Sequence, residues 1–156
     1  QMEAALTGLA PAADVVVMAA AVADFRPVAV VPGKIKKDQG VPQIVLEPTP
    51  DILAGLGATK PAGQVLVGFA AETSDLLVHA AAKLQRKHLD LIVANAVGAP
   101  GVGFQHDTNA VTLLGADGTT RTVALADKRA IAKAVLDTVV EIRGRDQPPH
   151  PPLPTS

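Results

Sequence analysis

The chain has 156 residues, which corresponds to one domain with a substantial core. Hydrophobic residues make up 48% and charged residues 19%, a balance that excludes a wholly disordered chain. Fourteen Lys and Arg residues against fifteen Asp and Glu residues give a net charge of −1, so no global basic field favours nucleic acid or an anionic membrane.

The hydrophobic pattern alternates helix-like and strand-like segments along the chain. Residues 2–9 are helix-like, and three apolar runs have the pattern of strands buried on both faces. Pro50 stands at the start of one predicted helix, where proline is tolerated. Strand–helix–strand units predict an α/β fold with a Rossmann-like, mostly parallel sheet flanked by helices. The predicted strands cover residues 14–20, 64–69 and 90–95, and the further helices cover 50–59, 74–88 and 127–143.

Helical spacing also predicts which side chains of the two longer helices face the core. In helix 74–88 these are Leu76, Leu77, Ala80, Ala81 and Leu84. In helix 127–143 they are Ile131, Ala134, Val135, Thr138 and Val139.

Two inserts interrupt this alternation, and both are predicted as β-hairpins. Residues 28–47 have a Pro32-Gly33 turn between two segments of mixed polarity, which indicates an exposed flap. Residues 109–124 contain Asp117-Gly118, a strong signal for a tight turn. Residues 144–156 are rich in proline and poor in apolar side chains, so we expect a disordered tail after a domain of residues 1–143.

Small and polar residues follow the predicted strands, at the edge where an open parallel sheet binds its ligands. Ala20, Ala21 and Asp24 follow the first strand, and Phe69 lies at the end of the second. The alanines would let a ligand approach the backbone, or they would serve tight helix–sheet packing. Asp24 would accept hydrogen bonds from a ribose or a base amino group, or form a local turn bond.

Lysines supply the candidate anion-binding groups. Lys34, Lys36 and Lys37 form the densest positive cluster, with the first two on one face of a predicted strand. On a mobile flap this cluster suits a polyphosphate, although lysines also protect exposed edge strands. Lys83 and Lys87 share one helix face, and spacing alone favours a role near the helix C-terminus over contact with a ligand.

The helix start at Pro50-Asp51 offers unpaired N–H groups to an anion or a nucleoside. Asp51 itself would suit a metal ion or complement the helix dipole. Several catalytic classes are excluded, because the four His lack metal-ligand spacing, no Gly-x-Ser-x-Gly occurs and Cys is absent. Neither the Gly-x-Gly-x-x-Gly dinucleotide motif nor a P-loop is present. The longest strongly apolar run, residues 15–23, is too short to span a bilayer, and we expect a cytoplasmic protein.

Seven short segments, in order between residues 13 and 143, together resemble one family closely. The family is that of phosphopantothenate–cysteine ligase, the synthetase half of the bacterial bifunctional coenzyme A biosynthesis protein. The segments are Ala20-Ala-Val-Ala-Asp-Phe-Arg-Pro, Lys34-Ile-Lys-Lys, Pro50-Asp-Ile-Leu, Gly68-Phe-Ala-Ala-Glu-Thr, Lys83-Leu-Gln-Arg-Lys, Asp90-Leu-Ile-Val-Ala-Asn and Gly103-Phe-Gln-His-Asp-Thr-Asn.

This resemblance implies ligation of 4′-phosphopantothenate to L-cysteine, with CTP as cosubstrate and Mg²⁺ as cofactor. The carboxylate first attacks the α-phosphorus to give an acyl-cytidylate, and the cysteine amine then displaces CMP. Lys34 would also stabilise charge as the cytidylate forms or breaks, and Ala20 and Ala21 would lie close to substrate; no metal ligands are implied. The implied nucleotide-contacting positions are Asp24, Lys34, Pro50, Asp51, Ile52, Leu53, Phe69, Lys83 and Lys87.

The resemblance further implies a homodimer, with the 109–124 hairpin as a contributor, and an FMN-binding decarboxylase half that is not part of this sequence. The family's glycine-rich strand–turn–helix and its Asn-Arg-Ser-Ser-Gly-like segment have no match here, so we expect these residues alone to be inactive. Two alternatives are an NAD(P)-binding domain of an oxidoreductase and a non-catalytic assembly module that pairs through the 109–124 hairpin.

Overall fold

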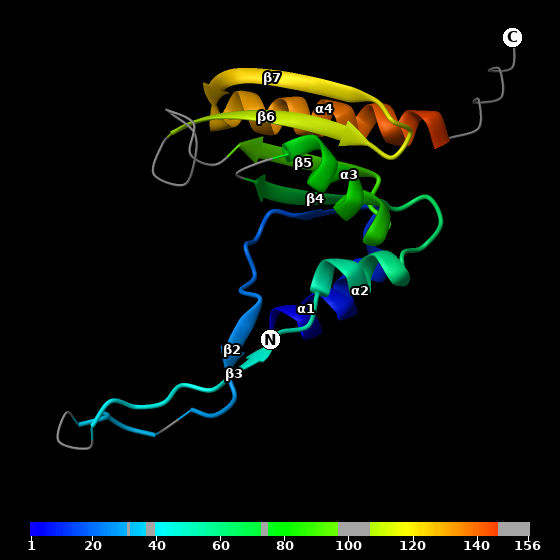
Figure 1. Ribbon diagram of the computed structural model, residues 1–156. Coiled ribbons are helices and arrows are strands. Elements are labelled where there is room, and N and C mark those ends of the chain that lie inside the picture. Colours follow the sequence, from blue (N-terminus) through cyan, green and yellow to red (C-terminus); the bar gives the residue numbers. More distant parts are fainter. Residues whose placement is uncertain (31, 37–39, 73–74, 97–106, 147–156) are drawn as a thin grey trace, which may run out of the picture.

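The computed structural model of the chain describes residues 1–30, 32–36, 40–72, 75–96 and 107–146. Figure 1 shows a sheet with helices on both faces and a long insert that projects away from it. The sheet has five strands in the order β1-β4-β5-β6-β7. These strands are β1 (Val15–Met18), β4 (Val65–Glu72), β5 (Leu91–Ala96), β6 (Thr108–Gly115) and β7 (Thr120–Asp127).

The remaining elements are helices and one small second sheet. The helices are α1 (Met2–Leu9), the 3-10 turn η1 (Ala10–Ala12), α2 (Ile52–Ala58), α3 (Leu76–Arg86) and α4 (Lys128–Asp146). Strands β2 (Phe25–Pro27) and β3 (Leu46–Pro48) pair antiparallel with each other in a separate two-stranded sheet.

The predicted α/β fold is confirmed, and the sheet is mixed. Strands β1, β4 and β5 are parallel, whereas β6 pairs antiparallel with β5 and β7 pairs antiparallel with β6. The 109–124 hairpin is therefore not a separate insert, because it continues the main sheet on the far side of β5. Its turn has Gly118 at φ 83°, a backbone conformation that glycine adopts readily.

Alternate residues of the central strands fill two apolar clusters, one on each face of the sheet. On one face, Leu66 and Ala70 pack with residues from α1, α2 and α3. On the other face, Val65 and Val67 pack with residues from α4. This division explains why β4 has an unbroken apolar sequence, since a strand that is covered on both faces has no solvent side.

Most of the predicted inward residues of the long helices are buried. In α4 the buried side chains are Ile131, Ala134, Val135 and Val139, with Thr138 partly buried. In α3, Ala80 and Leu84 are buried, but Leu77 is half exposed, which corrects the prediction. Leu76, its neighbour in the same turn, packs against the core cluster instead.

The helices that flank the parallel strands begin and end at recognisable caps. The side chain of Asp51 caps α2 by accepting a hydrogen bond from the N–H of Ala54 at 3.1 Å. At the end of α3, His88 adopts φ 51°, and the N–H of Leu89 donates to the oxygen of Leu84 at 3.0 Å. This Schellman-type ending turns the chain directly from α3 into β5.

The 28–47 insert differs from the predicted hairpin. Its paired strands, β2 and β3, lie at its base and have three residues each, with Arg26 opposite Glu47. Residues 32–36 and 40–45 form no strand, so Lys34 and Lys36 do not share a strand face, and Lys37 lies outside the described residues. The prolines of this segment lack the N–H that a strand ladder needs, which accounts for the short stem.

At the other end of the chain, α4 continues to Asp146, so residues 144–146 are helical rather than part of the predicted tail. Residues 147–156 lie outside the described part of the chain. No helix within the described ranges is both long enough and apolar enough to cross a membrane.

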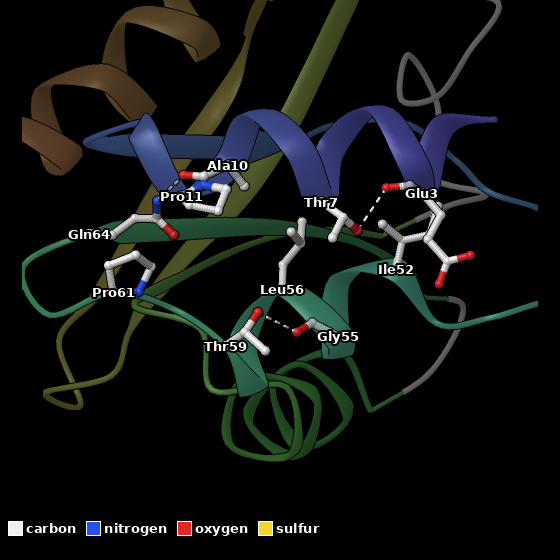
Figure 2. Close-up of a pocket in the computed structure, with 10 residues that line it drawn as sticks. All are labelled: Glu3, Thr7, Ala10, Pro11, Ile52, Gly55, Leu56, Thr59, Pro61 and Gln64. Carbon is white, nitrogen blue, oxygen red and sulfur yellow. Dashed lines mark hydrogen bonds between the residues drawn. The ribbon is translucent and has the colours of Figure 1, made fainter.

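A cavity of about 310 Å³ lies between α1 and α2, near the start of β4 (Figure 2). The side chains of Gln64, Thr7 and Thr59, which line it, have partners within the chain. The amide nitrogen of Gln64 donates to the oxygens of Ala10 and Ala13, both at 2.6 Å. Figure 2 shows the hydroxyls of Thr7 and Thr59 bonded back to their own helices. This cavity is therefore a feature of how α1 packs on α2.

Candidate functional site

A second cavity, of about 340 Å³, opens at the carboxyl ends of β1 and β4. Its walls come from the loop after β1, the turn that leads into α2, the end of β4 and the exposed side of α3. This is the edge at which an open α/β sheet binds its ligands. The lining residues are Met18, Ala20, Ala21, Val22, Ala23, Asp24, Thr49, Pro50, Asp51, Ile52, Leu53, Phe69, Ala70, Ala71, Lys83 and Lys87.

Ten positions that the sequence analysis singles out line this one cavity. They come from four separate parts of the chain, which the fold brings to one edge of the sheet. The ten are Ala20, Ala21, Asp24, Pro50, Asp51, Ile52, Leu53, Phe69, Lys83 and Lys87.

Lys34 is not among the lining residues of this cavity. It is exposed on the 28–45 insert, which Figure 1 shows extending away from the main sheet. The chain leaves the cavity after Asp24 and returns to it at Thr49, and the β2–β3 stem directs the residues between them outward. Within one copy of the described chain, the expected convergence of Lys34 with Lys83 and Lys87 is therefore absent.

The ammonium group of Lys87 forms an ion pair with the carboxylate of Asp51. Its Nζ lies 3.0 Å from Oδ1 and 2.9 Å from Oδ2. Partial burial raises the pKa of Asp51, but the hydrogen bonds from Lys87 and Ala54 and the nearby positive charges outweigh it, so the net pKa lies below its ordinary value. The Asp51 carboxylate thus caps a helix and fixes a lysine, which leaves it poorly placed for the metal role considered from the sequence.

Asp24 contrasts with Asp51. Its carboxylate forms no hydrogen bond or ion pair with the described residues, so the local turn bond considered from the sequence is not formed. Its main-chain oxygen instead accepts from the N–H of Thr49 at 2.8 Å, and the Thr49 hydroxyl donates to the oxygen of Ala23. These two bonds fasten the loop after β1 to the turn before α2, and they leave the Asp24 carboxylate for a ligand.

Six of the lining residues were not singled out from the sequence, and Thr49 is the polar one among them. Its position directly before the Pro50-Asp51 helix start is the only sequence signal for it. Its two contacts are with residues 25 or more positions earlier in the chain, so no local pattern predicts them.

Two further parts of the cavity wall differ in character. One carries an aromatic ring, and the other carries two lysine ammonium groups. Phe69 is 42% exposed on β4, where it is paired with Val93 of β5. Lys83 and Lys87 are both partly buried on α3 and lie one turn apart. A partly exposed ring, two ammonium groups and a carboxylate can together hold a phosphorylated ligand that carries a flat ring and hydroxyl groups.

The described residues contain no group of three or more His, Asp or Glu side chains that could hold a metal ion.

Comparison with known proteins decides the family. Residues 1–142 match the model of the DNA/pantothenate metabolism flavoprotein C-terminal domain. This chain belongs to that family. The family match covers every element of the cavity described above, and it also covers the insert that carries Lys34.

Individual relatives agree with this assignment. Over 150 residues the chain is 46% identical to the coenzyme A biosynthesis bifunctional protein CoaBC of Mycobacterium tuberculosis, covering 90% of this chain and 36% of the relative. The chain thus spans about a third of the length of that curated relative.

Solved structures share the fold. The crystal structure of the C-terminal domain of a CoaBC protein has a TM-score of 0.73 at 34% identity, covering 94% of this chain and 62% of that chain. A Cab2 mutant in complex with phosphopantothenate-cysteine has a TM-score of 0.66 at 22% identity, covering 90% of this chain and 49% of that chain. The second likeness is one of fold alone.

Proposed function

We propose that this chain contributes the nucleotide site of a phosphopantothenate–cysteine ligase that uses CTP. One observation carries the proposal: the nucleotide-contacting positions implied by the family resemblance, apart from Lys34, surround a single cavity at the carboxyl edge of the sheet. These positions come from segments far apart in the sequence, and nothing in their spacing requires them to meet. Their convergence supports a shared ligand.

The chemistry needs a site that binds a triphosphate and leaves its α-phosphorus accessible. In the first step, a carboxylate oxygen of phosphopantothenate bonds to the α-phosphorus, and pyrophosphate leaves. In the second step, the cysteine amine bonds to the acyl carbon, loses a proton, and CMP leaves with the electrons of the broken bond. Activation is required because a carboxylate is a poor acyl donor until its oxygen becomes part of a phosphate leaving group.

We assign the roles from the geometry of the cavity. Lys83 and Lys87 would balance the negative charge of the nucleotide, and Phe69 would contact its flat base. The unengaged carboxylate of Asp24 would accept hydrogen bonds from ribose hydroxyls or a base amino group. Mg²⁺, when bound with the triphosphate, would neutralise part of its charge.

Lys34 requires a second copy of the chain under this proposal. We infer that the protein is a homodimer in which the 28–45 insert of one copy reaches the cavity of the other. The insert exposes a row of apolar side chains, among them Val30 at 89% and Val41 at 97%, which a second copy would cover. The β6–β7 hairpin, whose β7 edge is unpaired in the five-stranded sheet, would contribute to the same assembly.

Calorimetric titration tests the nucleotide proposal. We expect the unmodified chain to bind CTP with Mg²⁺ and to bind ATP and NADH more weakly. Lys83→Ala and Lys87→Ala should each lower CTP affinity about tenfold or more, because a hydrogen bond to a charged group contributes about 1.5–3 kcal/mol. Binding of NADH alone would favour the oxidoreductase alternative, and unchanged CTP affinity in both variants would contradict the proposed site.

Lys133→Ala is the matched control for these lysine variants. Lys133 lies on α4 in an exposed i,i+4 pair with Asp137, away from the cavity. The Lys133→Ala variant removes the same positive charge as the two cavity variants, so a general electrostatic effect on CTP affinity would appear in this variant too. We expect its CTP affinity to stay within about twofold of the unmodified chain.

Sedimentation analysis tests the dimer. Val30→Asp places a charge on the apolar row of the insert and should shift the chain toward monomer. Val78→Asp on α3, where the side chain is 68% exposed, introduces the same change outside the insert and should leave the assembly intact. A monomeric unmodified chain, or equal effects of the two variants, would contradict the pairing through the insert.

A further inference from the structure

We propose that Gly57 is a positioning residue for the nucleotide site, an inference that rests on the function proposed above. Gly57 lies in α2 and does not line the cavity. A Cβ at this position would lie 1.9 Å from the main-chain oxygen of Lys87 and 2.9 Å from its carbonyl carbon. Since no side chain fits there, α2 packs against the end of α3 at a distance that only glycine permits.

The requirement at Gly57 is for space and not for an unusual backbone conformation. Gly57 is not among the residues with positive φ, so an alanine would adopt the same helical backbone without strain. An alanine would also favour the helix through its intrinsic propensity. The only cost of the substitution is the clash with a main-chain carbonyl, which cannot rotate away as a side chain could.

Lys87 is thereby held by α2 in two places. Its main-chain carbonyl contacts α2 at Gly57, and its ammonium group contacts the α2 N-cap residue, Asp51. Six positions separate Asp51 from Gly57, which is about 9 Å of helix rise. The lysine side chain therefore runs along α2 toward the cavity, and one helix fixes both its origin and its charged end.

A second close contact connects this arrangement to the sheet. A Cβ on Gly68 of β4 would lie 2.9 Å from Cδ2 of Leu53 and 2.7 Å from Cδ1 of Leu89. Leu53 lines the cavity, and Leu89 follows the last turn of α3. Here α2, β4 and the end of α3 are closely packed. A displacement of α2 at Gly57 would therefore also move the residues that line the cavity.

The test compares two glycines of the same helix. Gly57→Ala should lower CTP affinity about tenfold, because a misplacement of about 1 Å is enough to disrupt a bound geometry. Gly55→Ala is the matched control, since a Cβ there meets nothing within 4 Å. It should leave CTP affinity within about twofold and keep or raise the melting temperature.

A second control separates positioning from general destabilisation. Val139→Ala removes buried volume on the opposite face of the sheet, in the α4 cluster. It should lower the melting temperature while leaving CTP affinity unchanged, whereas Gly57→Ala should lower affinity even at temperatures where it is fully folded. Gly57→Ala with unchanged affinity, or equal affinity losses in Gly57→Ala and Val139→Ala, would overturn the inference.

A double-mutant cycle tests whether Gly57→Ala lowers CTP affinity by displacing Lys87. In a Lys87→Ala background, Gly57→Ala should cost clearly less affinity than it does alone, because the ammonium that it displaces is already absent. Full additivity would overturn the inference. A chain that binds no CTP in its unmodified form would instead refute the proposed function, so the two failures are distinguishable.

Hydrogen exchange on the unmodified chain keeps the inference testable if Gly57→Ala does not fold. Saturating CTP should raise amide protection in α2 as far as Gly57, although Gly57 lies outside the cavity. Protection confined to the cavity-lining residues 49–53 would overturn the inference.

Discussion

The cavity rim and the 28–45 insert present two kinds of structure within one chain. At the rim, the ammonium group of Lys87 forms an ion pair with Asp51, which caps α2, and the main-chain carbonyl of Lys87 closely approaches Gly57 just outside the cavity. In the insert, a three-residue ladder, the Arg26–Glu47 pair and a single further backbone bond from Val28 to Val45 hold the stem. Beyond the stem the apolar side chains are exposed.

This comparison shows that a positively charged side chain is not sufficient to form an anion-binding site. Lys34 and Lys87 are both cations that the family resemblance assigns to the nucleotide, but only Lys87 is placed by the fold of its own chain. Lys34 depends on contacts that the described residues do not supply.

Truncation of a core side chain should separate the two regions most strongly. Leu113 is 1% exposed in β6, so Leu113→Ala should lower the free energy of unfolding by about 2–5 kcal/mol. Val41→Ala, in the insert, should change it by less than about 0.5 kcal/mol at concentrations where the chain is monomeric, because no residue of its own chain covers that side chain. Urea unfolding measures both. A similar loss in the two variants would mean that the insert is part of the cooperative core.

The cost of backbone strain should also differ between the main sheet and the insert. Gly118 has φ 83° in the turn of the β6–β7 hairpin, and Gly33 has φ 95° in the insert. Gly118→Ala should cost about 1–2 kcal/mol, because the hairpin is part of the main sheet and cannot relax. Gly33→Ala should cost much less, since the insert can adjust without loss of packing. Equal costs in thermal unfolding would contradict the comparison.

The ion pair at the rim should matter more than the one in the stem. Because the pKa of Asp51 is lowered on folding, its charge stabilises the folded state above its ordinary pKa, and that stability is lost as pH falls through the lowered value. Asp51→Asn keeps a capping residue, so at pH 7 it should cost about 1 kcal/mol or less, discounted because the carboxylate is half exposed.

Unfolding measured against pH checks this expectation. The difference between Asp51→Asn and the unmodified chain should be full at pH 7 and should shrink below about pH 4. Glu47→Gln, which breaks the exposed pair in the stem, should cost about 0.5 kcal/mol or less at neutral pH. A difference for Asp51→Asn that does not depend on pH would show that the charge is not its cause.

A gain of stability is expected at the end of α3. His88 adopts φ 51°, a conformation that costs a side chain energy and that glycine adopts freely. His88→Gly should therefore raise the free energy of unfolding by about 0.5–1 kcal/mol. Arg86→Gly, in the last helical turn, is the control and should lower it by about as much as glycine disfavours a helix. A lower melting temperature for His88→Gly would refute this account.

Much of the fold could be predicted because its signals are local. The apolar runs of β4 and β5 identify strands covered on both faces, and Asp117-Gly118 identifies the β6–β7 turn. The apolar run of β1 also identifies a strand, but Val17 is 43% exposed, so the prediction that this strand is covered on both faces is wrong. The stem of the insert could not be placed in this way, because its pairing of Phe25 with Pro48 depends on residues that are far apart. Leu77 satisfies the helical pattern as well as Leu76 does, and only the packing of α3 decides which of the two is covered.

In the candidate site, too, local sequence signals identify some residues, whereas others depend on contacts between distant parts of the chain. Sequence motifs indicate Asp24, Lys83 and Lys87 as separate candidates, each with a plain structural explanation beside the functional one. The contacts of Thr49 and the space requirement at Gly57 have no local signature, since both depend on where α2 lies against β4 and α3.

The sequence by itself determined the class of the fold and the identity of most cavity-lining residues, because hydrophobic period, turn chemistry and motif order are properties of neighbouring residues. Only the tertiary structure decided that Asp51 holds Lys87, that Gly57 must lack a side chain, and that Lys34 lies outside the cavity of its own chain. Those facts arise from side chains and carbonyls that meet across elements, where close packing leaves room for only one arrangement.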